Sequence, residues 1–153
     1  MFRKVATLAI ALLEVATAET DADRSFAELC EINGFQFEEH TVITDDKYIL
    51  TLYRIPGEHG DETQGKPAVL MQHGVMDSAY GWVMNHPEVA PGFVAAKAGY
   101  DVWFGNSRGN TYSRSNLDID PDKDPENFFK FSWQEMGDYD LPAVFRYVTE
   151  HTQ

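Results

Sequence analysis

The chain has 153 residues, 43% of them hydrophobic, and a formal net charge of −13. This size supports one globular domain with a hydrophobic core, and the negative charge without a basic run argues against a nucleic-acid partner. The one cysteine, Cys30, excludes an internal disulfide and a zinc site built on thiolates. We expect Cys30 to be a small buried hydrophobic residue.

Residues 1–18 have the pattern of a secretory signal peptide. Arg3 and Lys4 give a positive start, residues 5–13 are almost wholly apolar, and the triplet Ala16-Thr17-Ala18 fits a cleavage site. The alternative is a short N-terminal helix. No other apolar run approaches the length of a membrane span, so we expect no transmembrane segment.

The next elements predicted are a short helix and a hairpin. Ser25 and Glu28 have capping-box spacing, and Gly34 is placed to end the helix. Residues 35–43 and 48–55 are strand-like and are joined by a turn at 44–47. In the second strand, Ile49, Thr51 and Tyr53 are expected on one face, and Tyr48, Leu50, Leu52 and Arg54 on the other. Residues 56–66 are predicted to form a surface loop.

Residues 68–75 hold the first candidate for chemistry. The run Ala68–Gln72 fits a strand buried on both faces of a parallel sheet, with the carboxyl end where such sheets bind ligands. We expect Gly74 to turn the chain sharply and to aim the N–H of Val75 above the strand end, as half of an oxyanion hole. The alternative is an ordinary glycine between strand and loop.

The following segments predict a parallel crossover. Residues 77–91 are expected to be a loop with Tyr80 and Trp82, followed by a helix from Pro91 that closes at Gly99 and a strand at 100–104. Residues 105–126 are predicted to be loop.

Two helix starts are predicted near the C-terminus. Ser132 and Glu135 again have capping-box spacing. Asp140 is expected to cap a better helix that has Pro142 in its first turn. The spacing of its apolar residues predicts one buried stripe, made of Leu141, Val144, Phe145 and Val148.

The segment from Gly105 to Gly109 matches the Gly-x-Ser-x-Gly pattern of a nucleophile elbow, with Ser107 at its centre. An elbow leads into an apolar helix, but residues 110–116 have no apolar stripe. The acid and histidine partners should follow later strands, whereas the one later histidine, His151, lies on or just past a helix. We therefore reject Ser107 as a nucleophile and predict a polar turn in which Arg108 pairs with a carboxylate.

The remaining polar residues give weaker signals. A calcium loop counted from Asp118 needs glycine sixth and glutamate twelfth, and Lys123 and Phe129 occupy those places. We expect a solvated acidic loop there and no metal site. We expect His40, His59 and His86, which have no partner at ligand spacing, to be surface or hydrogen-bonded residues.

Three blocks together resemble the acid lipase family, the gastric and lysosomal lipases of the α/β-hydrolase fold. The first is Gln72-His73-Gly74-Val75 with Asp77, Ser78 and Trp82. The second runs from Gly99 to Asn110 with Tyr112 and Ser113. The third runs from Phe131 to Met136 and continues with Tyr139-Asp140-Leu141-Pro142-Ala143. The resemblance extends over nearly all of residues 25–150, and residues 25–60 look like the family's lipase-associated N-terminal segment.

The resemblance implies an α/β fold: the N-terminal part of an α/β-hydrolase sheet, with the hairpin and the first parallel βαβ unit in residues 25–153. It implies hydrolysis of glycerol or sterol esters by a Ser-His-Asp triad without a cofactor. The one position carried over is Val75, an oxyanion donor through its N–H, with His73 and Gly74 shaping the loop. In such lipases the Asn-Ser-Arg-Gly stretch is a structural turn.

The family's nucleophile follows the next strand, and this sequence ends at Gln153. We therefore expect an N-terminal fragment that is inactive alone, with the strand at Ala68–Gln72 left as an open, aggregation-prone edge. The expected partner is a lipid ester or lipid surface, and the expected location is secreted or lumenal. Two alternatives stay open: a non-catalytic lipid-binding or regulatory module, and a small esterase that uses Ser107 and His151.

Overall fold

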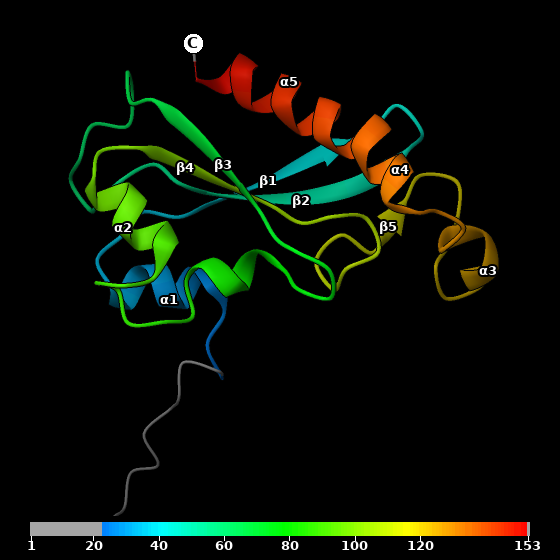
Figure 1. The fold of residues 1–153 in the computed structure, drawn as a ribbon, viewed down its shortest axis with the longest axis horizontal. Helices are drawn as coiled ribbons and strands as arrows, with labels where there is room; N and C mark the ends of the chain where they lie inside the picture. Colours follow the sequence, from blue (N-terminus) through cyan, green and yellow to red (C-terminus); the bar gives the residue numbers. More distant parts are fainter. Residues whose placement is uncertain (1–22, 153) are drawn as a thin grey trace, which may run out of the picture.

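A computed structural model of the chain describes residues 23–152, so the predicted signal peptide lies outside the described residues. Figure 1 shows a twisted sheet with helices on both faces. The strand order is β1-β2-β4-β3, and a short β5 pairs with β2. The bounds of the strands are β1 Glu38–Ile43, β2 Tyr48–Ile55, β3 Ala68–Gln72, β4 Asp101–Gly105 and β5 Ser115–Asn116.

The N-terminal part folds close to expectation. Ser25 caps α1 (Phe26–Ile32) in a full capping box with Glu28. The predicted hairpin is confirmed by antiparallel pairing of β1 with β2, although β1 begins at Glu38. Phe35 is buried before the strand and forms only an isolated bridge with Glu58.

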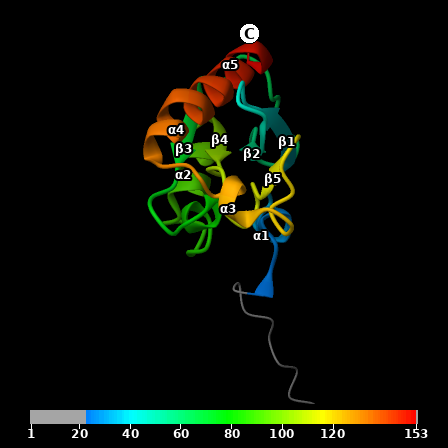
Figure 2. The ribbon, with the colours of Figure 1, turned by 90° about the vertical axis from the view of Figure 1, so that its right-hand side faces the viewer.

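The two faces of β2 alternate as predicted and enter two separate cores. One core lies beneath α1 and α2 (Pro91–Lys97) and includes Tyr53, Ile55, Val102 and Phe104. The other lies beneath α5 (Leu141–His151) and includes Tyr48, Leu50, Leu52 and Trp103. Figures 1 and 2 show α5 and α1 on opposite faces of the sheet.

The predicted parallel crossover is confirmed, because β3 pairs with β4 in parallel and α2 lies between them in sequence. The expectation that β3 is buried on both faces is wrong. Ala68 is exposed and the other residues of β3 are only half-buried, whereas every residue of β4 is buried. The reason is position: β3 is the end strand of the order, and its outer edge has no partner strand within residues 23–152.

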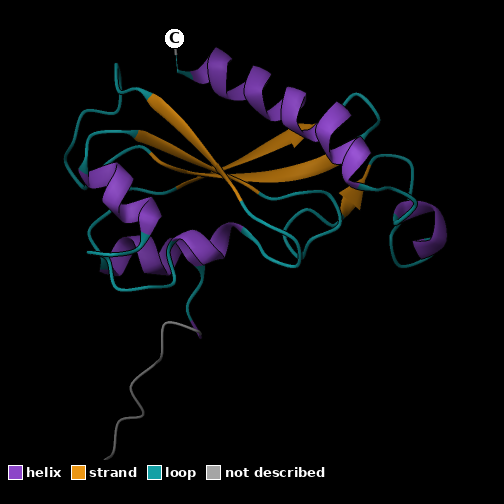
Figure 3. Ribbon diagram, viewed as in Figure 1, coloured by secondary structure: helices purple, strands orange, loops and turns teal. Residues whose placement is uncertain are grey.

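The two predicted loops contain more structure than expected. The 3-10 turn η2 (Ala79–Trp82) lies within residues 77–91, and Ser78 caps it. Residues 105–126 contain β5 and the start of α3 (Pro125–Phe128), which Asp124 caps. Figure 3 shows α3 at the far end of the molecule from α2.

The C-terminal helix starts earlier than predicted. The Ser132 capping box is confirmed at the start of α4 (Trp133–Glu135), but the chain continues through the π-helical turn η3 (Met136–Asp140) directly into α5. Asp140 has helical backbone angles and no capping bond, so its predicted cap role is wrong.

The predicted buried stripe on α5 is half right. Val144 and Val148 are buried together with Ala143, but Phe145 is 55% exposed and Leu141 is only half-buried. The helix therefore rests on the sheet through a face rotated away from Phe145. No helix among residues 23–152 is both long and apolar enough to cross a bilayer.

Candidate active site at the carboxyl edge of the sheet

The two parallel strands end at the same level, because Gln72 of β3 pairs with Gly105 of β4. The loops that follow, residues 73–78 and 106–113, therefore leave the sheet side by side. Asn106 joins them through its side-chain oxygen, which accepts the N–H of Ala79 at 3.0 Å. Its side-chain amide donates to the carbonyl of Thr51 on β2 at 3.2 Å. The strand ends are thus fixed relative to each other.

His73 holds the first loop against the second. Its Nε2 accepts the backbone N–H of Ser107 at 3.0 Å and lies 3.3 Å from the side-chain amide of Asn110. Nδ1 lies 2.8 Å from the carbonyl of Gly74. Because Nε2 accepts, the proton belongs on Nδ1, which donates to that carbonyl. Both ring nitrogens are occupied, so His73 positions the loop and has no free nitrogen to act as a base.

The loop after His73 leaves a backbone donor exposed. The N–H of Val75 makes no hydrogen bond within residues 23–152, and this residue is 84% exposed. The sharp turn was expected at Gly74, but the residue with left-handed backbone angles is Met76, at φ 60°. Gly74 is not among the positive-φ glycines, so the turn depends on the residue two places later.

A hollow of about 730 Å³ lies over this edge, and we call it the carboxyl-edge hollow. It is bounded by residues 73–77, by residues 107–110, and by Phe131, Ser132, Trp133 and Met136 from the segment that starts α4. Trp133 is 81% exposed and Met76 is fully exposed. The hollow therefore combines an apolar wall with the unpartnered N–H of Val75, and apolar walls with a few polar groups are typical of small-molecule binding sites.

Within residues 23–152, no base is hydrogen-bonded to the Ser107 hydroxyl; the neighbouring His73 ring accepts the Ser107 backbone N–H instead. The hydroxyl oxygen of Ser107 accepts from the side-chain amide of Gln72 at 3.0 Å. His151 is engaged on another surface, where its ring stacks on Tyr147 with centroids 3.9 Å apart. Serine catalysis requires a base that receives the hydroxyl proton, and the structure does not bring Ser107 and His151 together.

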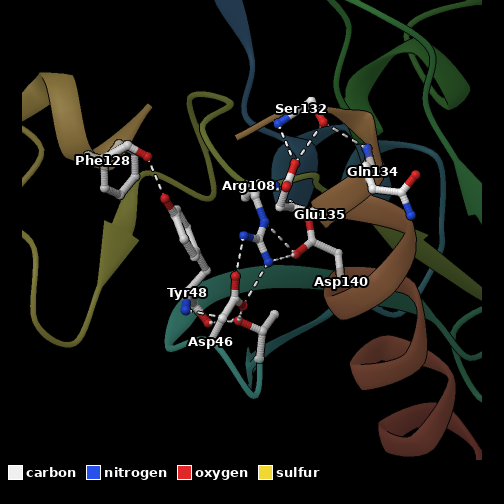
Figure 4. Close-up of polar contacts among 9 residues, drawn as sticks. Asp46, Tyr48, Arg108, Phe128, Ser132, Gln134, Glu135 and Asp140 are labelled. Carbon is white, nitrogen blue, oxygen red and sulfur yellow. Dashed lines mark hydrogen bonds and ion pairs between the residues drawn. The ribbon is translucent and has the colours of Figure 1, made fainter. Parts of the chain in front are cut away.

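Arg108 points the other way, into the protein, and is 2% exposed. Its Nε donates to Asp140 at 2.9 Å, its NH2 donates to Asp46 at 2.8 Å, and its backbone N–H also donates to Asp140 at 3.1 Å. The guanidinium carbon lies 4.0 Å from the ring centroid of Tyr48. Figure 4 shows this cluster between the β1–β2 turn and the start of α5. It joins three segments that are distant in sequence.

The two carboxylates of this cluster respond differently to their surroundings. Burial alone would raise the pKa of Asp46, but its bonds with Arg108 and Thr44 outweigh burial and hold the pKa below its ordinary value. Asp140 is more deeply buried, and burial raises the pKa of its carboxyl despite the bonds from Arg108. Sequence reasoning predicted a carboxylate for Arg108 but found neither partner, because Asp46 had been placed in a turn and Asp140 at a helix cap.

The remaining candidates have ordinary surroundings. Asp118, Asp120 and Asp122 pair with Lys47, Lys123 and Arg114 respectively. His40 bonds Glu38 and Tyr147, and His59 lies 3.3 Å from Glu31. Cys30 is buried as predicted, and burial raises the pKa of its thiol to about 12.

Comparison with known proteins gives consistent matches. The family model described as "Partial alpha/beta-hydrolase lipase region" matches residues 26–86. Human lipase member K is 44% identical over 88% of this chain and 34% of its own length. Rat gastric triacylglycerol lipase is 43% identical over 86% of this chain and 33% of its own length. A solved esterase structure from Pyrococcus furiosus covers 78% of this chain and 38% of that chain, at 18% identity and a TM-score of 0.46. The chain spans about a third of the curated relatives' length.

Proposed function

We propose, on the premise that this chain is related to the N-terminal part of the acid lipases, that it forms the oxyanion-binding part of a lipid ester hydrolase. The observation that carries the proposal is the exposed, unpartnered N–H of Val75 beside the apolar wall of the carboxyl-edge hollow. In acyl transfer, such a donor stabilises the negative oxygen of the tetrahedral intermediate. His73 and Gly74 hold this donor in place through the bond between them.

The substrate class we propose is a glycerol or sterol ester with an apolar acyl chain. Met76 and Trp133, both highly exposed beside the hollow, support an apolar ligand. The printed name of one relative, gastric triacylglycerol lipase, is consistent with this class. A secreted or lumenal location follows from the same relatives and from the signal-like residues 1–18.

We further propose that the 153-residue chain alone does not catalyse, and that the nucleophile, acid and histidine come from sequence beyond it. Two contacts support this proposal: the Gln72 amide holds the Ser107 hydroxyl, and the Ser107 N–H occupies His73. An oxyanion donor stabilises the tetrahedral intermediate, but that intermediate does not form without a nucleophile to attack the ester carbonyl.

The first experiment assays the purified 153-residue chain and its Ser107→Ala variant on a p-nitrophenyl ester and a triacylglycerol emulsion. We expect no turnover from either protein. Turnover by the chain that is abolished in Ser107→Ala would overturn the proposal and establish the small esterase. Sequencing the transcript past the codon for Gln153 tests the source of the nucleophile.

If a longer chain is encoded, the decisive variant in it is Val75→Pro, because proline has no N–H. Loss of one oxyanion donor should lower kcat by about 10²–10³-fold, whereas Ser107→Ala in the same chain should leave kcat within about fivefold, since Ser107 makes only a polar contact with Gln72, worth about 1 kcal/mol. An unchanged kcat in a folded Val75→Pro protein would remove Val75 from the mechanism.

A second candidate is a non-catalytic module that binds acyl chains, which the apolar lining of the carboxyl-edge hollow favours. Titration of the 153-residue chain with a fluorescent fatty acid tests it. Saturable binding that is weakened by Trp133→Ala would support this candidate, and no saturable binding would exclude it.

A further inference from the structure

A second hollow, of about 500 Å³, lies on the α1 face of the sheet and shares no lining residue with the carboxyl-edge hollow. Five of its eleven lining residues are aromatic: the partly exposed Phe37, Tyr80 and Tyr112, and the nearly buried Phe26 and Tyr53. We call it the aromatic hollow. The rings are mutually packed: the centroid of Phe26 lies 4.8 Å from that of Tyr53, and the centroid of Tyr53 lies 5.8 Å from that of Tyr112. The wall is therefore held in place before any ligand arrives.

The tyrosine hydroxyls of this wall have no partners of their own. Within residues 23–152, the hydroxyls of Tyr53, Tyr80 and Tyr112 make no hydrogen bond. Two tyrosines elsewhere behave differently: the Tyr48 hydroxyl donates to the carbonyl of Phe128, and the Tyr147 hydroxyl bonds His40. The hydroxyls of Tyr100 and Tyr139, two exposed tyrosines outside the hollow, also make no hydrogen bond within residues 23–152, so what distinguishes the hollow is that three such hydroxyls meet in one wall.

One carboxylate completes the site. Glu39 lines the aromatic hollow, and its side chain makes no ion pair or hydrogen bond within residues 23–152. Burial raises the pKa of Tyr53, and the charge of Glu39 raises it further, as do Tyr112 and Tyr80, which places these four groups near one another. Asp23 and Arg24 also line the hollow, and both have interaction partners. The charged side chains that line the hollow are two carboxylates and one guanidinium, so their formal charges sum to −1.

We propose that the aromatic hollow binds a quaternary ammonium group of the trimethylammonium type. The faces of aromatic rings attract a cation, and this attraction is strongest for weakly hydrated cations that fit among several rings. A quaternary ammonium has no N–H to donate, so the Phe26 and Phe37 walls cost it no hydrogen bond. Glu39 and the hydroxyl oxygens supply the negative charge and lone pairs that face its polarised methyl groups.

The aromatic hollow is connected to the carboxyl edge by a shared surface. Tyr112 also lines a smaller hollow, together with Met76 and Asp77, which themselves line the carboxyl-edge hollow. Trimethylammonium groups occur on free choline-like molecules and on the headgroups of choline phospholipids, and both present the same cation to this wall. The proposal does not depend on the lipase function, because it requires only the rings and Glu39.

The direct test is titration of the 153-residue chain with tetramethylammonium chloride, followed by the NMR signals of the tyrosine rings. We expect saturable shifts of Tyr53, Tyr80 and Tyr112, and no saturable shifts with ammonium or guanidinium chloride at equal ionic strength. Equal affinity for guanidinium, or no saturable shift with tetramethylammonium, would overturn the proposal.

Variants locate the binding. Tyr112→Leu removes one ring face and should weaken affinity about tenfold, whereas Tyr112→Phe keeps the face and should stay within about threefold. Glu39→Gln should weaken affinity about threefold, since Glu39 is exposed and solvent screens it. The matched control is Glu126→Gln, which removes the same charge from an exposed site outside the hollow and should change nothing.

If Tyr112→Leu fails to fold by far-UV circular dichroism, the exposed Glu39→Gln variant still tests whether the cation binds in the aromatic hollow. Wild-type affinity in both Glu39→Gln and a folded Tyr112→Leu would place the cation elsewhere and overturn the proposal. Choline and phosphatidylcholine vesicles then distinguish the sources. Binding to choline alone identifies a small-molecule site, and binding to phosphatidylcholine but not phosphatidylglycerol vesicles identifies a headgroup site.

Discussion

The loops after β3 and β4 leave the same edge of the sheet but differ in what they do with their polar groups. The loop after β4 turns Arg108 inward, where two carboxylates and the Tyr48 ring engage it fully. The loop after β3 leaves the Val75 N–H unpartnered and Met76 fully exposed. The loop that carries the catalytic-looking motif is thus the closed, structural one, and the open loop is the candidate for chemistry.

The largest expected effect comes from removing the buried Arg108 guanidinium from the loop after β4. Arg108→Met leaves Asp140 buried without its cation, which should lower the free energy of unfolding by about 3–5 kcal/mol. Urea denaturation followed by tryptophan fluorescence measures this loss. The control is Arg114→Met, whose exposed pair with Asp122 should contribute under about 1 kcal/mol. Equal losses in the two variants would contradict a structural role specific to Arg108.

A smaller effect should follow from disturbing the junction between the loops. In Gly105→Ala, the new Cβ would lie 2.1 Å from the side-chain oxygen of Gln72, so that side chain must leave Ser107. We expect a loss of about 0.5–1.5 kcal/mol in the free energy of unfolding, measured by urea denaturation, because Gln72 loses its hydrogen bond to Ser107. Gly137→Ala is the matched control: nothing lies within 4 Å of its Cβ and it is helical, so it should be neutral or stabilised by up to about 1 kcal/mol.

The pH dependence of stability should distinguish the two carboxylates that bind Arg108, those of Asp46 and Asp140. The pKa of Asp46 is lowered on folding, so its contribution is lost as the pH falls below the ordinary aspartate range. The pKa of Asp140 is raised, so its contribution is greatest in acid and is lost as the pH rises. As the pH is lowered, the urea concentration at the unfolding midpoint should therefore fall less in Asp46→Asn than in the unsubstituted chain. In Asp140→Asn it should fall more. The same slope in both variants would refute the assignment.

The smallest effect is expected in the open loop. Met76 has left-handed backbone angles, which cost a non-glycine residue about 1–2 kcal/mol, while glycine adds about 0.5–1 kcal/mol of chain entropy. Met76→Gly should thus stabilise the fold by about 0.5 kcal/mol, as measured by thermal denaturation. Met84→Gly, at an exposed methionine without left-handed angles, should instead destabilise. A loss in Met76→Gly as large as in Met84→Gly would contradict the backbone argument.

Much of the local structure was predictable because its signals lie within a few residues. The capping boxes at Ser25 and Ser132 join residues three apart, and both form as the spacing predicts. The hairpin and the parallel crossover also follow from short patterns of apolar residues and turns. The local patterns also proposed the Val75 N–H as an oxyanion donor and rejected Ser107 as a nucleophile, and the resemblance to acid lipases agreed with both and added the reaction class.

Tertiary structure decided where the polar side chains go. Asp140 has a good sequence signal for a helix cap, yet its carboxylate binds Arg108, 32 residues away, and Asp46 is 62 residues from Arg108. A helix cap contributes about 1 kcal/mol to stability, whereas burying a guanidinium without carboxylate partners costs several kcal/mol. The Asp140 carboxylate therefore binds Arg108, and the helix continues through Asp140 without a side-chain cap at that residue. The aromatic hollow arises in the same way, because Phe26, Tyr53 and Tyr112 meet only after the sheet has formed. The sequence alone therefore determined the elements and their order, and the folded structure decided the partners, because the cost of burying charge depends on residues that are distant in the chain.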